Sequence, residues 1–200
     1  MSPVELAAAP SASAGGSVAS APEAPILSVG APAPSFRDLL GVDGRRYGMA
    51  DFDDQAVLVL VFSSNRCPTA KAYGERLRAL QAEYGPRGVG LVVINSNDPY
   101  LYPEESYPRM VERAEEDGYT FSYLSDEGQR VARAYGPTRT FEVFALDRER
   151  QLRYTGRFDD ARLPERVTTT DLANALDDLL AGREVRVAQT RPFGCSLDLV

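Results

Sequence analysis

The architecture of this chain follows from residues 57–68, which read VLVLVFSSNRCP. Residues 57–62 form a continuous apolar run, which is typical of a central strand that is buried on both faces of a sheet. Pro68 favours the first position of a helix, because its missing N–H would have no partner there. Cys67 is therefore predicted to lie at a helix N-cap, directly after a buried strand.

Short β-branched runs and amphipathic helices alternate along the rest of the chain. From Pro68 to Tyr84 apolar residues recur at helical spacing, which predicts one helix that ends at Gly85-Pro86. Residues 89–94 (VGLVVI) predict a second buried strand. The pattern predicts an α/β fold with a central mixed sheet flanked by helices and an N-terminal β-hairpin extension. The remaining predicted elements are a hairpin of 36–40 and 45–47 around the turn 41–44, helices over about 104–117, about 126–135 and from the N-cap Thr170 to Gly182, and strands over 121–124, 141–146 and 151–157.

The 200 residues suffice for one domain with a tail at each end. Residues 1–34 are mostly Ala, Ser, Pro, Gly and Val and are expected to be disordered, residues 35–182 form the domain, and residues 183–200 form an extended tail. The first residues lack the basic and apolar segments of a secretory signal, and no apolar run approaches the length of about 18 residues that spans a membrane. We therefore expect a cytoplasmic protein with no membrane partner.

The composition narrows the possible chemistry. The chain has no histidine, which excludes Ser-His-Asp and Cys-His machinery and HExxH metal sites. Its two cysteines cannot build a four-cysteine metal site, and no cofactor is expected. The formal net charge of −7 argues against a nucleic-acid partner, which requires a basic face. Any catalytic or binding chemistry of this chain must therefore use thiol, carboxylate, arginine, hydroxyl or backbone groups.

Cys67 is the strongest candidate nucleophile. A helix N-terminus stabilises a thiolate, and Arg66 and Lys71 add positive charge nearby, so the pKa of Cys67 is expected to lie below the free value of about 8.5. Lys71 is the only lysine among 22 basic residues and is predicted to lie one helical turn from Cys67. The alternative is that Cys67 is a small, unreactive residue of the core.

Five segments carry a family resemblance: FSSNRCPTAKAYGERLRALQAEYG (62–85), VVINSNDPYLYPEESY (92–107), FSYLSDEGQRVARAYG (121–136), YTGRFDD (154–160) and FGCS (193–196). They resemble the peroxiredoxin-like branch of the thioredoxin superfamily, which is related to alkyl hydroperoxide reductase and the thiol-specific antioxidant proteins. The resemblance spans about residues 30–200 and implies a thioredoxin-like fold.

The chain departs from this family at two motifs. Relatives typically read CNHCP where this chain reads SNRCP (64–68), so Ser64 replaces the first cysteine and Arg66 the histidine. A dithiol exchange within this motif is therefore impossible. Relatives also carry a TCTP segment with a cis-proline, where this chain reads TRTF (138–141).

The resemblance also implies roles for three further residues. Ser64-x-x-Cys67-Pro68-Thr69 is similar to the Thr-x-x-Cys-Pro-Thr segment of peroxiredoxins, whose hydroxyl binds peroxide, and implies that Ser64 binds the substrate oxygen. Peroxiredoxins place an arginine on the strand near the cis-proline, which suggests that Arg139 polarises peroxide and holds the thiolate; the alternative is a solvated surface arginine. Cys195 matches a family position and is a candidate resolving thiol; the alternative is a tail cysteine that pairs between chains.

These residues predict a thiol oxidoreductase that reduces a hydroperoxide or a small disulfide through Cys67, with an external thiol as reductant. By analogy with relatives, it could form a homodimer. Two alternatives stay open: a redox-degenerate binding or assembly module, and a tailoring enzyme that uses Cys67 for non-redox covalent chemistry.

Three clusters give weaker signals. The acidic loop around Glu104 and Glu105 is interpreted as solvated rather than as a cation site, and the GRFDD motif (156–160) as an ion pair in a turn. The tyrosines Tyr100, Tyr102 and Tyr107 are interpreted as packing residues near the cysteine.

Overall fold

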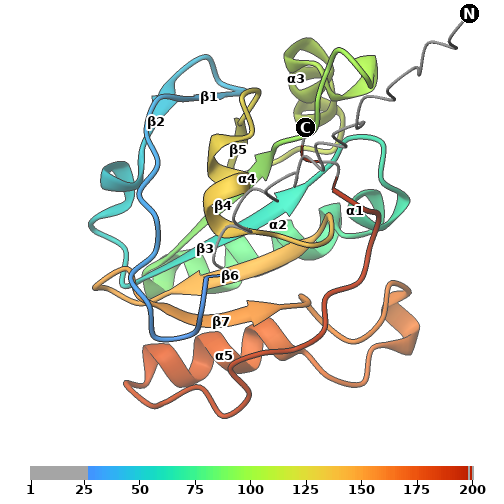
Figure 1. Cartoon of the computed structure of the whole chain (residues 1–200). Helices are drawn as coiled ribbons and strands as arrows, with labels where there is room; N and C mark the ends of the chain where they lie inside the picture. The colour runs from blue at the N-terminus through green and yellow to red at the C-terminus, as the bar shows by residue number, and fades with distance from the viewer. Residues whose placement is uncertain (1–26, 198, 200) are drawn as a thin grey trace, which may run out of the picture.

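A seven-stranded mixed sheet forms the centre of the computed structural model, which describes residues 27–197 and 199 (Figure 1). The strand order is β2-β1-β5-β4-β3-β6-β7. β3 pairs in parallel with β4 and β4 with β5, whereas β6 is antiparallel to β3 and β7 is antiparallel to β6. The strands are β1 (Leu39–Gly41), β2 (Arg46–Tyr47), β3 (Val57–Ser63), β4 (Val89–Asn95), β5 (Ser122–Ser125), β6 (Glu142–Leu146) and β7 (Leu152–Gly156).

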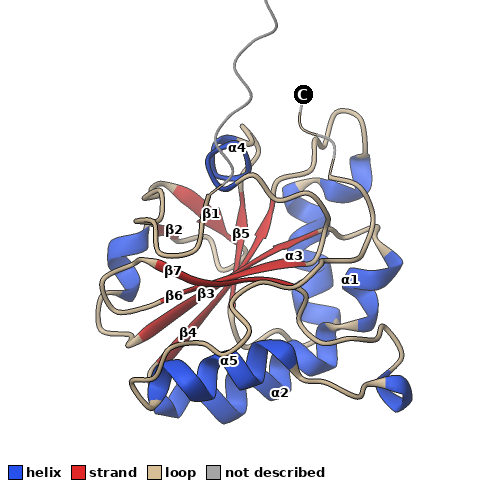
Figure 2. Ribbon diagram, turned by 60° about the horizontal axis from the view of Figure 1, so that its bottom comes forward, coloured by secondary structure: helices blue, strands red, loops and turns tan. Residues whose placement is uncertain are grey.

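Helices cover both faces of the sheet (Figure 2). Alternate residues of β3 point to opposite faces, so Val59 packs with one set of helices and Leu60 with the other. The first face carries α1 (Pro68–Ala72), α2 (Gly74–Tyr84), α3 (Tyr107–Glu116) and α5 (Asp171–Leu180), and the second carries α4 (Arg130–Tyr135). The apolar run of β3 is therefore buried on both sides, as its sequence predicts. The mixed α/β architecture and the antiparallel β1–β2 hairpin are confirmed.

The helix predicted over 68–84 is instead two helices that meet at Tyr73. The N–H of Tyr73 donates to Ala70 O, three residues back, which tightens the turn at the end of α1. The buried Tyr73 hydroxyl donates to Asp159 Oδ1 at 2.5 Å, which fixes the junction against a distant loop. The local periodicity does not reveal this long-range contact.

The last helix matches its prediction most closely. Thr170 occupies the N-cap of α5 and Gly182 follows its C-terminus with φ of +68°, as the capping signals predict. By contrast, α4 begins at Arg130 rather than near 126, because residues 126–129 form a turn. The Asp126 carboxylate in this turn accepts hydrogen bonds from the first N–H groups of α4.

The N-terminal tail is held to the sheet from residue 27 onward, although its composition predicts disorder up to residue 34. Gly30 N donates to Leu152 O at 2.7 Å, and Ala33 N donates to Arg150 O at 2.8 Å. These backbone hydrogen bonds attach the segment beside β7, which corrects the prediction for residues 27–34. Residues 1–26 lie outside the described residues.

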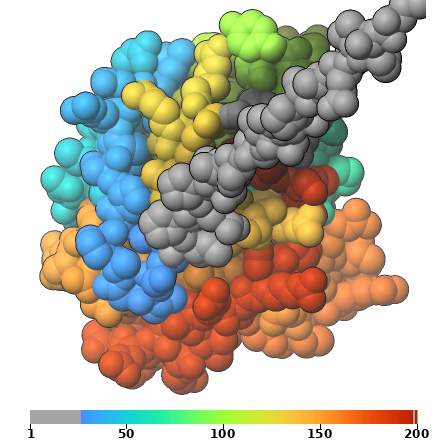
Figure 3. All heavy atoms as spheres, in the orientation of Figure 1, coloured from blue at the N-terminus to red at the C-terminus, as the bar shows by residue number. Residues whose placement is uncertain are grey.

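The C-terminal tail runs from α5 along β7 and then across the domain to the N-terminus of α1 (red in Figure 1). Thr155 and Gln189 form a parallel bridge, and Arg139 and Ser196 form an antiparallel one. The tail lies at the surface of the molecule (Figure 3). Its extended backbone brings Cys195 to the end of β3.

Within the described residues, no helix has the length and apolar character to cross a membrane.

Candidate active site

Cys67 lies where its sequence context predicts, at the N-cap of α1 and directly beyond the end of β3. Pro68 occupies the first helical position. The Cys67 residue is only 2% exposed, because the C-terminal tail and the loop before β6 pack against it. The Cys67 thiol thus lies at the end of a central strand, covered by the C-terminal tail.

The sulfur of Cys195 lies 2.7 Å from the sulfur of Cys67, and the two share a hydrogen bond. Both residues are free thiols in this structure, Cys67 buried and Cys195 exposed. A disulfide bond is about 2.05 Å long, so only a small approach separates these sulfurs from bonding distance. The sequence left open whether the two cysteines could meet, and the fold brings them together.

The two thiols have opposite pKa shifts. Burial raises the pKa of Cys67, but hydrogen bonds from Cys195, from Thr140 and from the backbone N–H groups of Ala70 and Cys195 outweigh this effect, and the pKa of Cys67 lies below its ordinary value. Burial and the neighbouring Cys67 raise the pKa of Cys195. Of the two thiols, Cys67 is therefore the one that loses its proton more readily, and its thiolate can accept a hydrogen bond from Cys195.

Thr140, which was not among the predicted site residues, contacts both cysteines. Its buried Oγ1 lies 3.4 Å from Cys67 Sγ and 3.1 Å from Cys195 O. Its backbone N–H also donates to Cys195 O at 2.9 Å. The only available signal was its place in the TRTF segment, next to the position where relatives carry the cis-proline.

Phe141, the residue after Thr140, anchors the loop to β3 and to Tyr73. Its φ is +72°, which is unusual for a residue with a side chain, and its N–H donates to Phe62 O in β3. The Phe141 ring packs 4.2 Å from the Tyr73 ring, centroid to centroid. The described residues include no cis peptide bond, so the loop before β6 reaches the sulfur without one.

Ser64 is buried beneath the turn that precedes Cys67. Its hydroxyl accepts a hydrogen bond from Cys67 N at 3.1 Å and donates to Glu105 Oε1 at 2.5 Å. The Ser64 hydroxyl proton is therefore directed to Glu105, whereas the Thr140 hydroxyl donates to the Cys67 sulfur. Glu105 is 3% exposed, so the interpretation of this residue as part of a solvated acidic loop is wrong.

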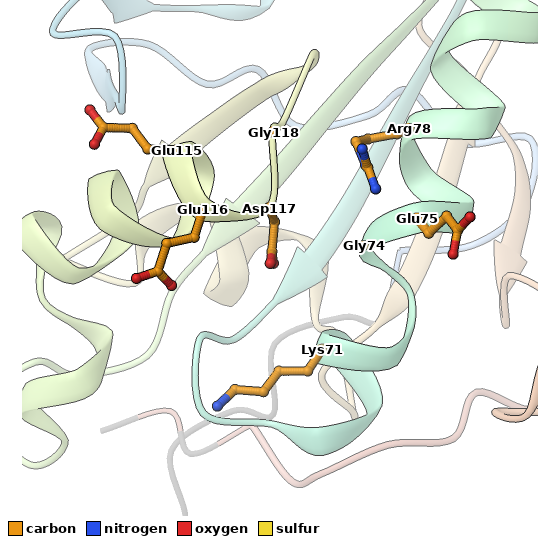
Figure 4. Close-up of a pocket in the computed structure, with 8 residues that line it drawn as sticks. All are labelled: Lys71, Gly74, Glu75, Arg78, Glu115, Glu116, Asp117 and Gly118. Atoms are coloured by element: carbon orange, nitrogen blue, oxygen red, sulfur yellow. The ribbon is translucent and has the colours of Figure 1, made fainter.

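Three basic residues were predicted to stabilise the Cys67 thiolate: Arg66, Lys71 and Arg139. Among the described residues, none of their side chains forms a hydrogen bond with the Cys67 sulfur. The Arg66 guanidinium lies 3.7 Å from the centroid of the Tyr102 ring, and Arg139 donates to Ser196 Oγ at 3.2 Å. Figure 4 shows Lys71 extended from α1 toward the C-terminal end of α3, where it lines a cavity with Glu116 and Asp117. The lowered pKa of Cys67 therefore arises from hydrogen bonds rather than from these charges.

The GRFDD motif fastens the helix junction next to the site. Asp159 accepts hydrogen bonds from the Tyr73 hydroxyl and from Arg76, and Arg157 pairs with Asp171 at the start of α5. Burial, together with the Asp159 carboxylate, raises the pKa of Tyr73, which therefore remains a donor. The ion pairs of the motif therefore join it to α2 and α5, which corrects the sequence interpretation of an ion pair within the turn.

Metal ligation has no support in the part of the chain that the structure describes, which contains no group of three or more His, Cys, Asp or Glu residues placed to hold an ion.

Comparison with known proteins places this site in a family context. A family model described as Redoxin matches residues 28–176. A hypothetical protein from Sinorhizobium meliloti 1021 is 38% identical, with a TM-score of 0.81 over 87% of this chain and 96% of that one. An uncharacterized conserved protein from Geobacillus kaustophilus is 39% identical, with a TM-score of 0.81 over 88% of this chain and 94% of that one.

More distant structures share the fold. A peroxidoxin from Mycobacterium tuberculosis is 16% identical, with a TM-score of 0.61 over 78% of this chain and 97% of that one. A search of the curated proteins gave no match. The thioredoxin-like fold that the sequence predicts is confirmed.

Proposed function

The chain belongs to the redoxin family, whose chemistry is thiol-based, and we propose that it is a two-cysteine oxidoreductase with Cys67 as nucleophile and Cys195 as resolving thiol. The observation that carries this proposal is the sulfur pair: 2.7 Å apart, with the pKa of one thiol lowered and that of the other raised. A thiolate beside a protonated thiol is the arrangement required for attack followed by resolution.

The substrate is a small oxidant, and a hydroperoxide fits best. Cys67 is 2% exposed beneath the tail, which favours an oxidant that needs little room over an extended protein segment. The Cys67 thiolate attacks one peroxide oxygen of ROOH, an S–O bond forms as the O–O bond breaks, and Cys67 becomes a sulfenic acid. The leaving alkoxide takes the proton of the adjacent Cys195 thiol and departs as ROH.

Resolution follows on the same pair of sulfurs. The Cys195 thiolate attacks the Cys67 sulfenic sulfur, the disulfide bond forms, and hydroxide leaves and is protonated to water. The substrate has then gained two electrons, one from each sulfur. An external thiol reductant restores both cysteines by thiol–disulfide exchange. A small disulfide would react in the same order, with a mixed disulfide on Cys67 in place of the sulfenic acid.

Two glycines at the contact between the tail and the domain, Gly194 in the tail and Gly156 at the end of β7, support a dedicated role for Cys195. A Cβ on Gly194 would lie 2.1 Å from Thr140 O, and one on Gly156 would lie 2.3 Å from Thr190 O. Both close approaches occur where the tail meets the domain. Only glycine permits them without a shift of the backbone, so the sequence specifies the docked tail and not only the cysteine that it carries.

The test is to add one equivalent of hydrogen peroxide to the reduced protein and to follow both thiols by peptide mass spectrometry. We expect an intrachain Cys67–Cys195 disulfide in the wild type and a sulfenic acid, trapped by dimedone, on Cys67 in the Cys195→Ser variant. Cys67→Ser should form neither. Non-reducing electrophoresis separates the intrachain disulfide from one between two copies.

Two results would overturn the proposal. A stable Cys67 sulfenic acid in the wild type with Cys195 unmodified would remove the resolving role. A Cys67 that reacts with peroxide no faster than free cysteine would remove the nucleophile and would favour a binding module that has lost its redox chemistry.

A further inference from the structure

Glu105 is a buried carboxylate that the reaction above does not use. It ends the short helix Pro103–Glu105 and is 3% exposed. Oε1 accepts from Ser64 Oγ at 2.5 Å and from Arg66 N at 3.3 Å, and Oε2 accepts from Asn65 N at 2.7 Å and from Asn95 Nδ2 at 3.0 Å. A carboxylate has about four lone-pair positions, and all four are filled by donors.

No lysine or arginine of the described chain forms an ion pair with Glu105. Its burial is compensated instead by neutral N–H and O–H groups, three of which belong to consecutive residues 64–66. A glutamine at this position would turn an amide N–H₂ toward two of the donors. The four contacts therefore require a carboxylate. The charged form of Glu105 thus stabilises the turn of residues 64–66 that leads into Cys67.

The turn is also held from its other side. Asn65 Nδ2 donates to Glu104 O at 2.9 Å, and the Tyr123 hydroxyl donates to Asn65 Oδ1 at 2.8 Å. Arg113 donates to Asn65 O at 3.0 Å. Asn65 is thus fixed through both its side chain and its backbone, and the adjacent Ser64 depends on Glu105 for its orientation.

We propose that Glu105 is a positioning residue for the Cys67 nucleophile, acting through Ser64. Glu105 accepts a hydrogen bond from the Ser64 hydroxyl, so a lone pair of that hydroxyl faces the Cys67 N–H. This contact fixes the backbone from which the Cys67 sulfur projects. The sulfur then lies within reach of its donors on Thr140 and Cys195. The inference rests on the proposed role of Cys67 as nucleophile, but it does not depend on which oxidant the protein reduces.

The experiment measures the rate of iodoacetamide alkylation of Cys67 against pH by mass spectrometry, together with thermal melting, in the full-length reduced protein. In Glu105→Gln we expect the apparent pKa of Cys67 to rise and its alkylation at pH 7 to slow by about fivefold to tenfold, because the sulfur loses alignment with its donors. Ser64→Ala should change the profile in the same direction, and Ser64→Thr should restore it because the hydroxyl returns.

Glu104→Gln is the matched control, since Glu104 is the exposed neighbour and contacts the turn only through its backbone oxygen. It should alkylate as the wild type does. If Glu105→Gln fails to fold, the Ser64 pair decides: a wild-type alkylation profile in Ser64→Ala overturns the proposal. A lower melting temperature with an unchanged profile overturns it as well, because it assigns Glu105 to stability alone.

Failure of the proposed function is a separate outcome. If peroxide produces no Cys67–Cys195 disulfide while the Glu105 and Ser64 variants still change the alkylation profile, the positioning role stands and the oxidoreductase mechanism falls.

Discussion

Replacing Thr140 by valine should raise the pKa of Cys67 while leaving the fold in place. Thr140 Oγ1 has one proton and two acceptors, Cys67 Sγ at 3.4 Å and Cys195 O at 3.1 Å. Valine keeps nearly the same shape and removes only the hydroxyl. The Cys195 carbonyl still accepts from Thr140 N at 2.9 Å, so the substitution leaves no orphaned acceptor on the tail.

The expected size follows from the strength of one hydrogen bond. A hydrogen bond to a charged group contributes about 1.5–3 kcal/mol, and the low end applies here because the Thr140 proton is shared between two acceptors. Since about 1.4 kcal/mol corresponds to one pKa unit, the pKa of Cys67 should rise by about one unit. Only the thiolate reacts, so alkylation should be about tenfold slower well below the pKa and nearly unchanged well above it.

The assay is the pH profile of Cys67 alkylation by iodoacetamide, with each cysteine quantified separately by mass spectrometry. Thr138→Val is the control from the same loop, because the Thr138 hydroxyl donates to Glu142 rather than to a sulfur. Its profile should match the wild type. If Thr140→Val and Thr138→Val give the same Cys67 profile, the hydroxyl does not stabilise the thiolate, and the assignment of the lowered pKa to hydrogen bonds is wrong.

Two further substitutions test the tail and the lone lysine. Gly194→Ala places a Cβ 2.1 Å from Thr140 O, so the tail must shift. After peroxide treatment, peptide mass spectrometry should show less Cys67–Cys195 disulfide and more overoxidised Cys67 than in the wild type. Gly182→Ala is the control: its φ is +68° and nothing lies near its Cβ, so this variant should form the disulfide normally. Lys71→Gln should leave the rate of Cys67 alkylation within about twofold of the wild type at each pH, because Lys71 faces the carboxylates at the end of α3. A pH profile displaced toward higher pH would show instead that Lys71 stabilises the Cys67 thiolate.

The sequence predicted the elements whose signals are local. The apolar run of β3, the Pro68 helix start and the caps of α5 depend on neighbours within a few residues, and each lies where it was expected. The position of Cys67 followed from the same local signals, and the predicted direction of its pKa shift was also correct. Sequence neighbours fix a backbone position well because the first turn of a helix is itself local.

The cause of that pKa shift could not be predicted in the same way. Arg66 and Lys71 are close to Cys67 in sequence, but the Arg66 guanidinium stacks on Tyr102 and Lys71 extends toward α3. The side chains that contact the sulfur come from residues 140 and 195, far along the chain, and only the Ala70 N–H at the helix start is a local donor. The burial of Glu105 was not predicted for a similar reason. The loop around it is polar and acidic, which is typical of a solvated surface, and only the fold shows the hydrogen-bond donors that surround its carboxylate.

The placement of the two thiols sets the direction in which the disulfide would be reduced. Cys195 is exposed and Cys67 is 2% exposed, so an external thiol meets the Cys195 sulfur first. Attack there expels Cys67 as a thiolate, and the thiol with the lower pKa is the better leaving group. In the proposed mechanism the resolving thiol thus lies on a segment that covers the nucleophile, and residue 64, a serine, takes no part in the exchange. The covering sulfur can then receive the reductant while the buried one returns directly to its reactive form.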